Sequence, residues 1–275
     1  AETRLLAEAD VVVLTDASCS FEGWHRASAG VATVAPDMAA AIRSRARVPL
    51  FTAMAAFESH VSTDLDAFVV CADLDSPLWY ASRSASKPGL RFDTGTPDCW
   101  TLVSRPAFAA SEIQGTEMQD PHTGAFRPQE DAYLNGRDGP AERLVSAFEA
   151  ALGGQPLGKP TYLQGQRWGS AFPAPVRQFA SVAAAGEYRS VEEAGVGGSR
   201  VEVMGVTYET ATPDLRPTPG ASATRDGEQD FFMDTAAGLY YASDFCSTRV
   251  PGVEAAVLSA LDAAEHILGT VESSQ

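Results

Sequence analysis

The stretch that decides the fold is "GLYYASDFCSTRVPGVEAAVLSALDAAEHIL", residues 238–268. Its apolar run Leu239–Ala242 is typical of a short buried strand, and this run ends at the polar pair Ser243-Asp244. Pro251-Gly252 follows, and Glu254 suits the positive end of a helix that begins there. The stretch therefore predicts a strand that delivers an acid to a helix N-terminus, where anions and electron-rich oxygens commonly bind.

The helix of this stretch has a clear apolar periodicity. We expect Ser247 or Thr248 to cap it and Pro251 to lie in its first turn. The residues at helical spacing predict a packed face made of Val253, Ala256, Val257, Ala260, Leu261, Ala264, Ile267 and Leu268. The alternative for the acid is an ordinary strand–loop–helix in which Asp244 only caps a turn, and this stretch alone favours that alternative.

Composition and charge exclude several classes of protein. Apolar residues make up 45% of the chain and charged residues 20%, which is typical of a globular protein. The formal net charge of -16 argues against binding to nucleic acid and to anionic lipid surfaces. No apolar run approaches the roughly 18 residues that span a bilayer. The four cysteines and four histidines are scattered without metal-ligand spacing, so we expect free thiols, with one or two disulfides as the alternative.

The rest of the chain divides into strand and helix patterns. Helices are expected over residues 35–47, begun by Pro36-Asp37, and over residues 140–154, with a polar loop at residues 111–139. Residues 211–230 have the composition of a linker, and residues 201–210 suggest a strand. Six further segments predict strands: residues 10–16, 48–59, 66–73, 76–89, 98–106 and 160–173.

Four segments carry a resemblance to a known family. "FTAMAAFES" (51–59), "LWYASRSASKPGL" (78–90), "QRWGSAFP" (166–173) and the stretch from Tyr240 to Ile267 resemble the renalase-like FAD-dependent amine oxidases, in their order and context. The most similar branch has plant plastid members. The resemblance implies that Asp244 lies on the ribityl or pyrophosphate side of FAD and that the helix starting at Gly252-Val253-Glu254 points its dipole at the flavin. It implies that Arg167 and Trp168 lie near the isoalloxazine ring or the substrate cavity. In the alternative, Trp168 fills core and Arg167 pairs with a surface acid.

The chain also departs from that family. Members open with a strand and a G-x-G-x-x-G turn whose amides hold the pyrophosphate, and this sequence contains no such motif. Its nearest candidate, Gly195-Val196-Gly197-Gly198, lacks the third glycine and is expected to be a surface turn. Ser243 stands where the family has a glycine that lets the backbone approach the cofactor. We therefore expect no cofactor, and FAD only if the chain is an enzyme.

These observations predict an α/β fold (mixed α+β), an incomplete FAD-oxidoreductase fold with a mostly antiparallel substrate-side sheet. The resemblance implies that residues 1–47 and 231–268 form a discontinuous remnant of the FAD-binding lobe and that residues 48–174 form a substrate-like β-rich lobe. Residues 175–230 are an insertion or extended loop, and residues 269–275 are a tail.

The function expected from this pattern is that of a non-catalytic accessory subunit of a larger assembly. Residues 205–230 are the expected contact with other protein subunits. No transmembrane segment is expected, and a place at the periphery of a membrane complex is compatible with this. The plastid-like branch and the Ala-Glu start favour a processed organellar, chloroplast protein of a photosynthetic assembly, although a fragment would start in the same way. Two alternatives remain: an FAD-dependent oxidoreductase whose N-terminal half is missing, and a small-ligand binding module with a cavity between Trp79, Trp100 and Trp168.

Overall fold

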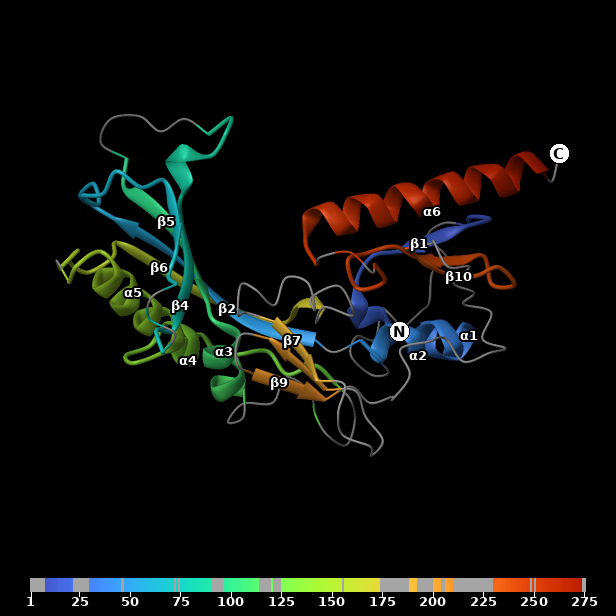
Figure 1. Cartoon of the computed structure of the whole chain (residues 1–275), viewed down its shortest axis with the longest axis horizontal. Coiled ribbons are helices and arrows are strands. Elements are labelled where there is room, and N and C mark those ends of the chain that lie inside the picture. Colours follow the sequence, from blue (N-terminus) through green and yellow to red (C-terminus); the bar gives the residue numbers. More distant parts are fainter. Residues whose placement is uncertain are drawn as a thin grey trace, which may run out of the picture. The chain divides into compact units, whose positions relative to one another are not determined.

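The computed structural model of the chain describes most of the sequence. The described residues are 8–21, 30–45, 47–71, 73, 75–90, 96–113, 120, 125–154, 156–173, 188–191, 200–203, 206–209, 230–247, 249 and 251–273. The chain divides into two compact units (Figure 1). Unit 1 comprises Ala1–Arg47, Gln119–Phe126 and Phe172–Gln275, and unit 2 comprises Val48–Met118 and Arg127–Ala171. Helices and strands occur in both units, so the protein belongs to the α/β class that the sequence predicts.

Unit 2 is built on a five-stranded antiparallel sheet with the strand order β3-β4-β5-β2-β6. Alternation along the strands explains its two faces, because every second residue of β5 is buried. In β2, Phe51, Ala53, Ala55 and Phe57 all join the core. The strands are β2 (Arg47–Phe57), β3 (Ala67–Val69), β4 (Leu78–Arg83), β5 (Asp98–Ser104) and β6 (Tyr162–Pro173), and a short 3-10 helix, η2 (Ser84–Ser86), follows β4.

Three helices cover one face of this sheet: α3 (Pro106–Ile113), α4 (Asp131–Asn135) and α5 (Pro140–Ala151). The amphipathic α5 contributes Leu144, Val145 and Phe148 to the core. The Phe148 ring lies 4.8 Å from the Trp100 ring and 5.9 Å from the Phe68 ring, between centroids. The prediction of a loop over residues 111–139 was therefore wrong at its edges, where α3 ends and α4 forms. Polar composition concealed α4, which buries a single side chain, Leu134.

Unit 1 contains a three-stranded mixed sheet with the order β1-β11-β10. The central strand β11 (Leu239–Tyr241) runs parallel to β1 (Val12–Leu14), with Val12 opposite Leu239. It runs antiparallel to β10 (Phe232–Asp234). Both predicted strands, residues 10–16 and the run at Leu239, are confirmed by this sheet.

Helices cover both faces of the unit 1 sheet, which explains why β11 is apolar on both sides. The Tyr240 hydroxyl lies 3.2 Å from Nδ1 of His266 in the long helix α6 (Val253–Ser273), which covers one face. On the other face lie α2 (Pro36–Arg43), confirmed as a helix begun by Pro36, and α1 (Val31–Val34) before it (Figure 1). A 3-10 helix, η1 (Ala17–Ser20), follows β1, and Asp16 caps it by accepting a hydrogen bond from the Ser18 amide.

The buried face of α6 differs from the predicted one. The residues that pack are small: Ala255, Ser259 and Ala263 are fully buried. Val253, Val257, Leu261 and Leu268, which the sequence placed in the packed face, are exposed. The helix is apolar on two sides, and its periodicity alone could not tell which side meets the sheet. Within the described part of the chain, no helix is long and apolar enough to cross a bilayer.

The region predicted as an insertion or extended loop, residues 175–230, contains a separate antiparallel sheet. Its strands are β7 (Tyr188–Val191), β8 (Arg200–Val203) and β9 (Val206–Glu209), in the order β7-β8-β9. The predicted strand at residues 201–210 is thus two strands of a hairpin. The glycine turn at Gly195–Gly198 and most of the expected contact segment, residues 210–229, lie outside the described residues.

Candidate functional site

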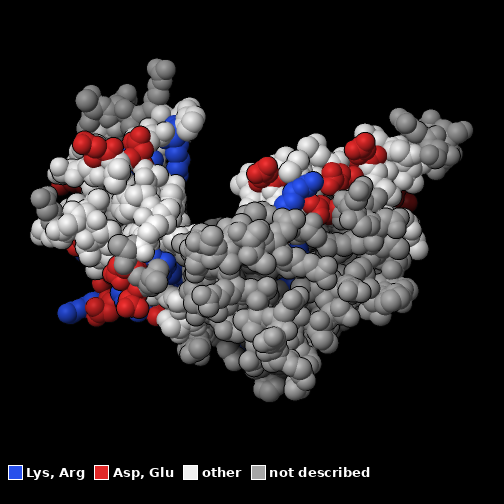
Figure 2. Space-filling model, viewed as in Figure 1, with Lys and Arg blue, Asp and Glu red and all other residues white. Residues whose placement is uncertain are grey.

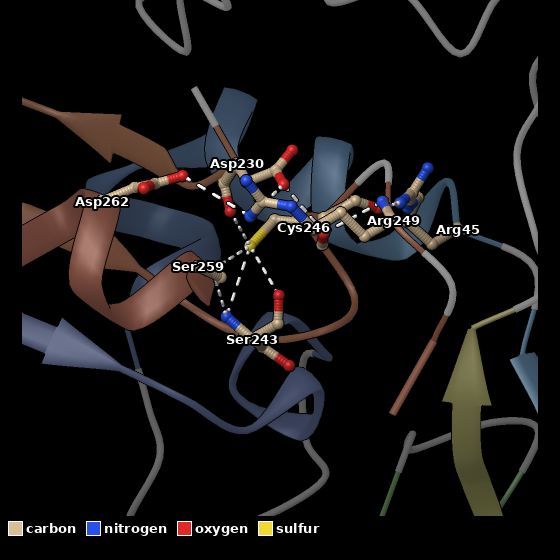
Figure 3. A network of polar contacts seen from close by, with 8 residues as sticks. Arg45, Asp230, Ser243, Cys246, Arg249, Ser259 and Asp262 are labelled. Atoms are coloured by element: carbon tan, nitrogen blue, oxygen red, sulfur yellow. Dashed lines mark hydrogen bonds and ion pairs between the residues drawn. The ribbon is translucent and has the colours of Figure 1, made fainter. Parts of the chain in front are cut away.

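The candidate site is the junction between β11 and α6, residues 242–252, where the sequence predicts an acid at a helix N-terminus. The junction continues directly from the sheet, because the Ala242 amide still donates to the Leu14 carbonyl of β1 at 3.0 Å. A network of polar contacts then ties the loop to α6, to the end of α2 and to the start of β10 (Figure 3). Its members are Arg45, Asp230, Ser243, Cys246, Ser247, Arg249, Ser259 and Asp262.

Hydrogen bonds to its backbone hold Ser243 in place. Its amide donates to Oγ of Ser259, 2.9 Å away in α6, and also lies 3.3 Å from Sγ of Cys246. The Cys246 thiol in turn lies 3.0 Å from the Ser243 carbonyl and 3.2 Å from Oγ of Ser259. Cys246 and Ser259 are fully buried, so these bonds form away from water. This triangle joins the loop to the first turns of α6, and a small residue at Ser259 lets the two approach.

A second set of contacts surrounds the buried carboxylate of Asp230, just before β10. Oδ2 of Asp230 accepts a hydrogen bond from the Ser247 hydroxyl at 2.9 Å and pairs with Arg249 at 2.9 Å. Arg249 also lies 3.8 Å from the carboxylate of Asp262 in α6. Arg45, beyond the end of α2, donates to the backbone carbonyls of Phe245 and Ser247. Charged groups from three separate segments thus fix the course of the loop.

Asp244 lies where the sequence places it, between the end of β11 and the start of α6. Its carboxylate accepts a hydrogen bond from the Ser243 hydroxyl at 3.1 Å. Burial raises the pKa of Asp244 above its usual value, and the Ser243 hydroxyl, together with nearby backbone groups, offsets part of that rise. The acid therefore makes its hydrogen bond within its own loop.

The other predicted residues at the helix start have different surroundings. Gly252 has a φ of 145°, which favours glycine, and its carbonyl accepts the first helical bond of α6 from Ala256 at 3.0 Å. The side chains of Val253 and Glu254 are exposed. Ser247 does not cap α6, because its hydroxyl donates to Asp230 and accepts from the Arg249 amide. Thr248 lies outside the described residues.

Arg167 and Trp168 lie in β6 of unit 2, on opposite faces of the sheet. Arg167 is only 4% exposed, on the face that the helices cover, and desolvation lowers its pKa. Trp168 is 49% exposed on the other face, where its Nε1 donates to Oγ1 of Thr52 at 3.0 Å. Since neighbouring residues of a strand point to opposite sides, these two side chains do not line one cavity.

Two of the three tryptophans of the ligand-binding alternative are separated in the same way. Trp100 is buried beneath α5, where the guanidinium of Arg83 lies 4.8 Å from its ring. Trp168 lies on the opposite, exposed face. The structure therefore does not bring Trp100 and Trp168 together.

No group of three or more His, Cys, Asp or Glu side chains among the described residues could hold a metal ion. All four cysteines are free thiols; Cys19 and Cys246 are buried, and Cys71 is exposed. Burial raises the pKa of Cys19 to about 11, because the thiolate is poorly solvated there.

Sequence reasoning missed six residues of the network: Arg45, Asp230, Cys246, Arg249, Ser259 and Asp262. Only one of them carried a readable signal. Ser259 stands between Ala255 and Ala263 at four-residue spacing, outside the predicted apolar face, and a small polar residue in such a row can serve a buried hydrogen bond.

No protein-family model matches this chain, and no curated protein matches it either. The resemblance to renalase-like amine oxidases therefore stays a prediction from its sequence segments.

Proposed function

We propose that this chain is a non-catalytic accessory subunit of a larger protein assembly, derived from a flavin oxidoreductase. One observation carries the proposal. At the junction where a dinucleotide would meet the helix N-terminus, the half-buried carboxylate of Asp244 lies just before α6 and bonds to the Ser243 hydroxyl of its own loop. A diphosphate brought to this point would face that negative charge in a chain of net charge -16.

The rest of the junction supports the same proposal. Ser243 donates its amide to Ser259 and its hydroxyl to Asp244, so neither group is left for a ligand. The sequence provides no glycine-rich turn to hold a pyrophosphate from the opposite side. A junction whose polar groups bind one another stabilises the fold and has fewer groups left to hold a ligand, which supports a non-catalytic role. The plastid location remains a proposal from the sequence resemblance alone.

One observation favours the alternative, an FAD-dependent oxidoreductase whose N-terminal half is missing. Asp244 follows β11 directly and precedes α6, which is the order that the resemblance implies for the flavin side. Arg167 and Trp168 give this alternative less support, because their side chains lie on opposite faces of β6.

Two measurements test the proposal. The purified chain is titrated into FAD while the flavin fluorescence anisotropy is followed, and we expect no rise. Stoichiometric binding that Asp244→Lys abolishes would overturn the proposal in favour of the oxidoreductase. In extracts of the source cells, native electrophoresis with an antibody against the chain should place it in an assembly well above its own 29.0 kDa. Migration only at the monomer mass would also contradict it.

A further inference from the structure

The outward face of α6 is apolar over most of its length. Val253 is 83% exposed, Val257 51%, Leu261 58% and Leu268 64%. Ala260 and Ala264 are exposed with them. At about 100° per residue, these six residues fall within one arc of the helix, on the side away from the buried Ala255, Ser259 and Ala263. Large aliphatic side chains in one continuous row are rare on a solvent face and indicate an interaction surface.

The spacing within this row is that of a helix-packing surface. Val257, Leu261, Ala264 and Leu268 follow one another at intervals of four, three and four residues. This alternation keeps apolar side chains on a straight seam against a second helix, with knobs from each helix in holes of the other. A row of this kind fits a helical partner that presents its own apolar seam.

The charges beside the row narrow the choice of partner. Glu254 and Glu265 are exposed along one edge of the arc, and α6 contains no lysine or arginine from Val253 to Ser273. In Figure 2 the surface over α6 is mostly white with separate acidic side chains and a basic group beside them; Arg249, just before the helix, is paired with Asp230. A second copy of the chain would bring two such acidic helices together, with no basic residue on either. Anionic lipid would meet the same repulsion.

From this row and its acidic edge, we propose that the outward face of α6 binds an amphipathic helix of a partner protein that has an apolar seam and a lysine- or arginine-rich edge. The inference rests on the proposed function, since it names the surface through which an accessory subunit joins its assembly. The apolar row supplies the buried area, while Glu254 and Glu265 select a basic partner.

The test uses synthetic helices and the whole chain. One probe peptide, about three heptads long, carries leucine and alanine at the seam and lysine at the edges. A second peptide has the same seam with glutamate edges. Binding to the fluorescein-labelled peptides is measured by anisotropy, at low and at high salt. We expect the chain to bind the lysine peptide at least about tenfold more tightly than the glutamate peptide, with a difference that shrinks as salt rises.

Three variants locate the binding. Leu261→Ser with Leu268→Ser removes two large side chains from the row and should weaken binding of the lysine peptide by at least about tenfold. Glu254→Lys with Glu265→Lys keeps the row and should reverse the preference toward the glutamate peptide. Val34→Ser is the matched control, because Val34 is an exposed aliphatic residue of unit 1 on α1, and it should leave both affinities unchanged.

Four outcomes would overturn the inference. The lysine peptide could fail to bind, or bind equally well to the Leu261→Ser, Leu268→Ser variant. Sedimentation could show that the chain forms a dimer that this variant dissociates, which would make a second copy the occupant. Lipid vesicles could retain the wild type and release the variant, which would make a membrane the occupant. None of these readouts depends on FAD, so the inference can fail while the chain remains an assembly subunit.

Discussion

The sharpest test of the hydrogen bonds that join the β11–α6 loop to α6 is Ser259→Ala, which removes one buried oxygen from α6. Oγ of Ser259 accepts the Ser243 amide at 2.9 Å. Without it, the amide keeps only Sγ of Cys246 at 3.3 Å, a weaker acceptor. A buried donor that loses its acceptor costs about 1–3 kcal/mol of stability. Because the sulfur still accepts weakly, we expect a loss in the lower half of that range, about 1–2 kcal/mol. Alanine returns about 0.5 kcal/mol through helix propensity.

The expected net loss is therefore about 1 kcal/mol in the free energy of unfolding. Urea unfolding followed by far-ultraviolet circular dichroism measures it, since α6 contributes strongly to that signal. Hydrogen exchange of the Ser243 amide provides a local reading of the same loss, with protection expected to fall about fivefold. Thr270→Ala is the control on the same helix: its hydroxyl donates to the His266 carbonyl at an exposed position, so no loss of stability is expected.

A double variant makes the argument refutable. Cys246→Ala removes the second acceptor of the same amide, so each single variant leaves one acceptor in place. Together, Ser259→Ala and Cys246→Ala should cost about 1 kcal/mol more than the sum of the single changes. If Ser259→Ala is as stable as the wild type and the double variant is additive, the Ser243 amide does not depend on this triangle. The junction would then not be closed in the way described.

Three further predictions concern charge and packing. Asp230→Asn should destabilise unit 1 by about 2–3 kcal/mol in urea, because Arg249 and Ser247 lose a buried carboxylate; a loss no larger than that of Glu254→Gln, at the exposed helix start, would contradict this. Asp244→Asn should be at least as stable as the wild type at pH 7. The raised pKa of Asp244 means that folding penalises its charged form. This penalty is present above the raised pKa and is relieved as the pH falls through it, so the urea midpoints of the wild type and the variant should converge as the pH is lowered to 4. An advantage of the variant that grows toward low pH would refute the sign. Phe148→Ala should cost about 4 kcal/mol and Phe148→Leu about 1–2 kcal/mol, read from tryptophan fluorescence in urea, since the ring packs on Trp100; equal costs would show that no cavity forms.

Much of unit 2 could be predicted from the sequence because its signals are local. Strand β2 buries alternate residues from Phe51 to Phe57, and α5 shows one apolar face bounded by Pro140 and Gly153-Gly154. In each case the residues that face the core can be identified from their spacing within the element itself. The helix α4 lacks that advantage, because one buried leucine in five residues gives no periodicity to read.

The candidate site divides along the same line. The position of Asp244, at a strand end before a helix, follows from neighbouring residues and could be predicted. The contacts of Arg45 and Asp230 with the junction join segments that are far apart in the sequence, so no spacing announces them. For α6 the sequence offered two apolar faces, and only the packing of Ala255, Ser259 and Ala263 identified the buried one. Hydrophobicity favoured the larger side chains, whereas close approach of helix and loop required the smaller ones.

The pairing of β1 with β11 has a consequence for how the protein is made. During translation Val12 emerges from the ribosome long before Leu239, its partner in the parallel ladder. All strands of unit 2 are synthesised well before Leu239, whereas the unit 1 sheet cannot form until β11 has been synthesised. Unit 2 should therefore fold in the nascent chain while β1 is still unpaired. During this interval a chaperone that binds short aliphatic segments can bind β1.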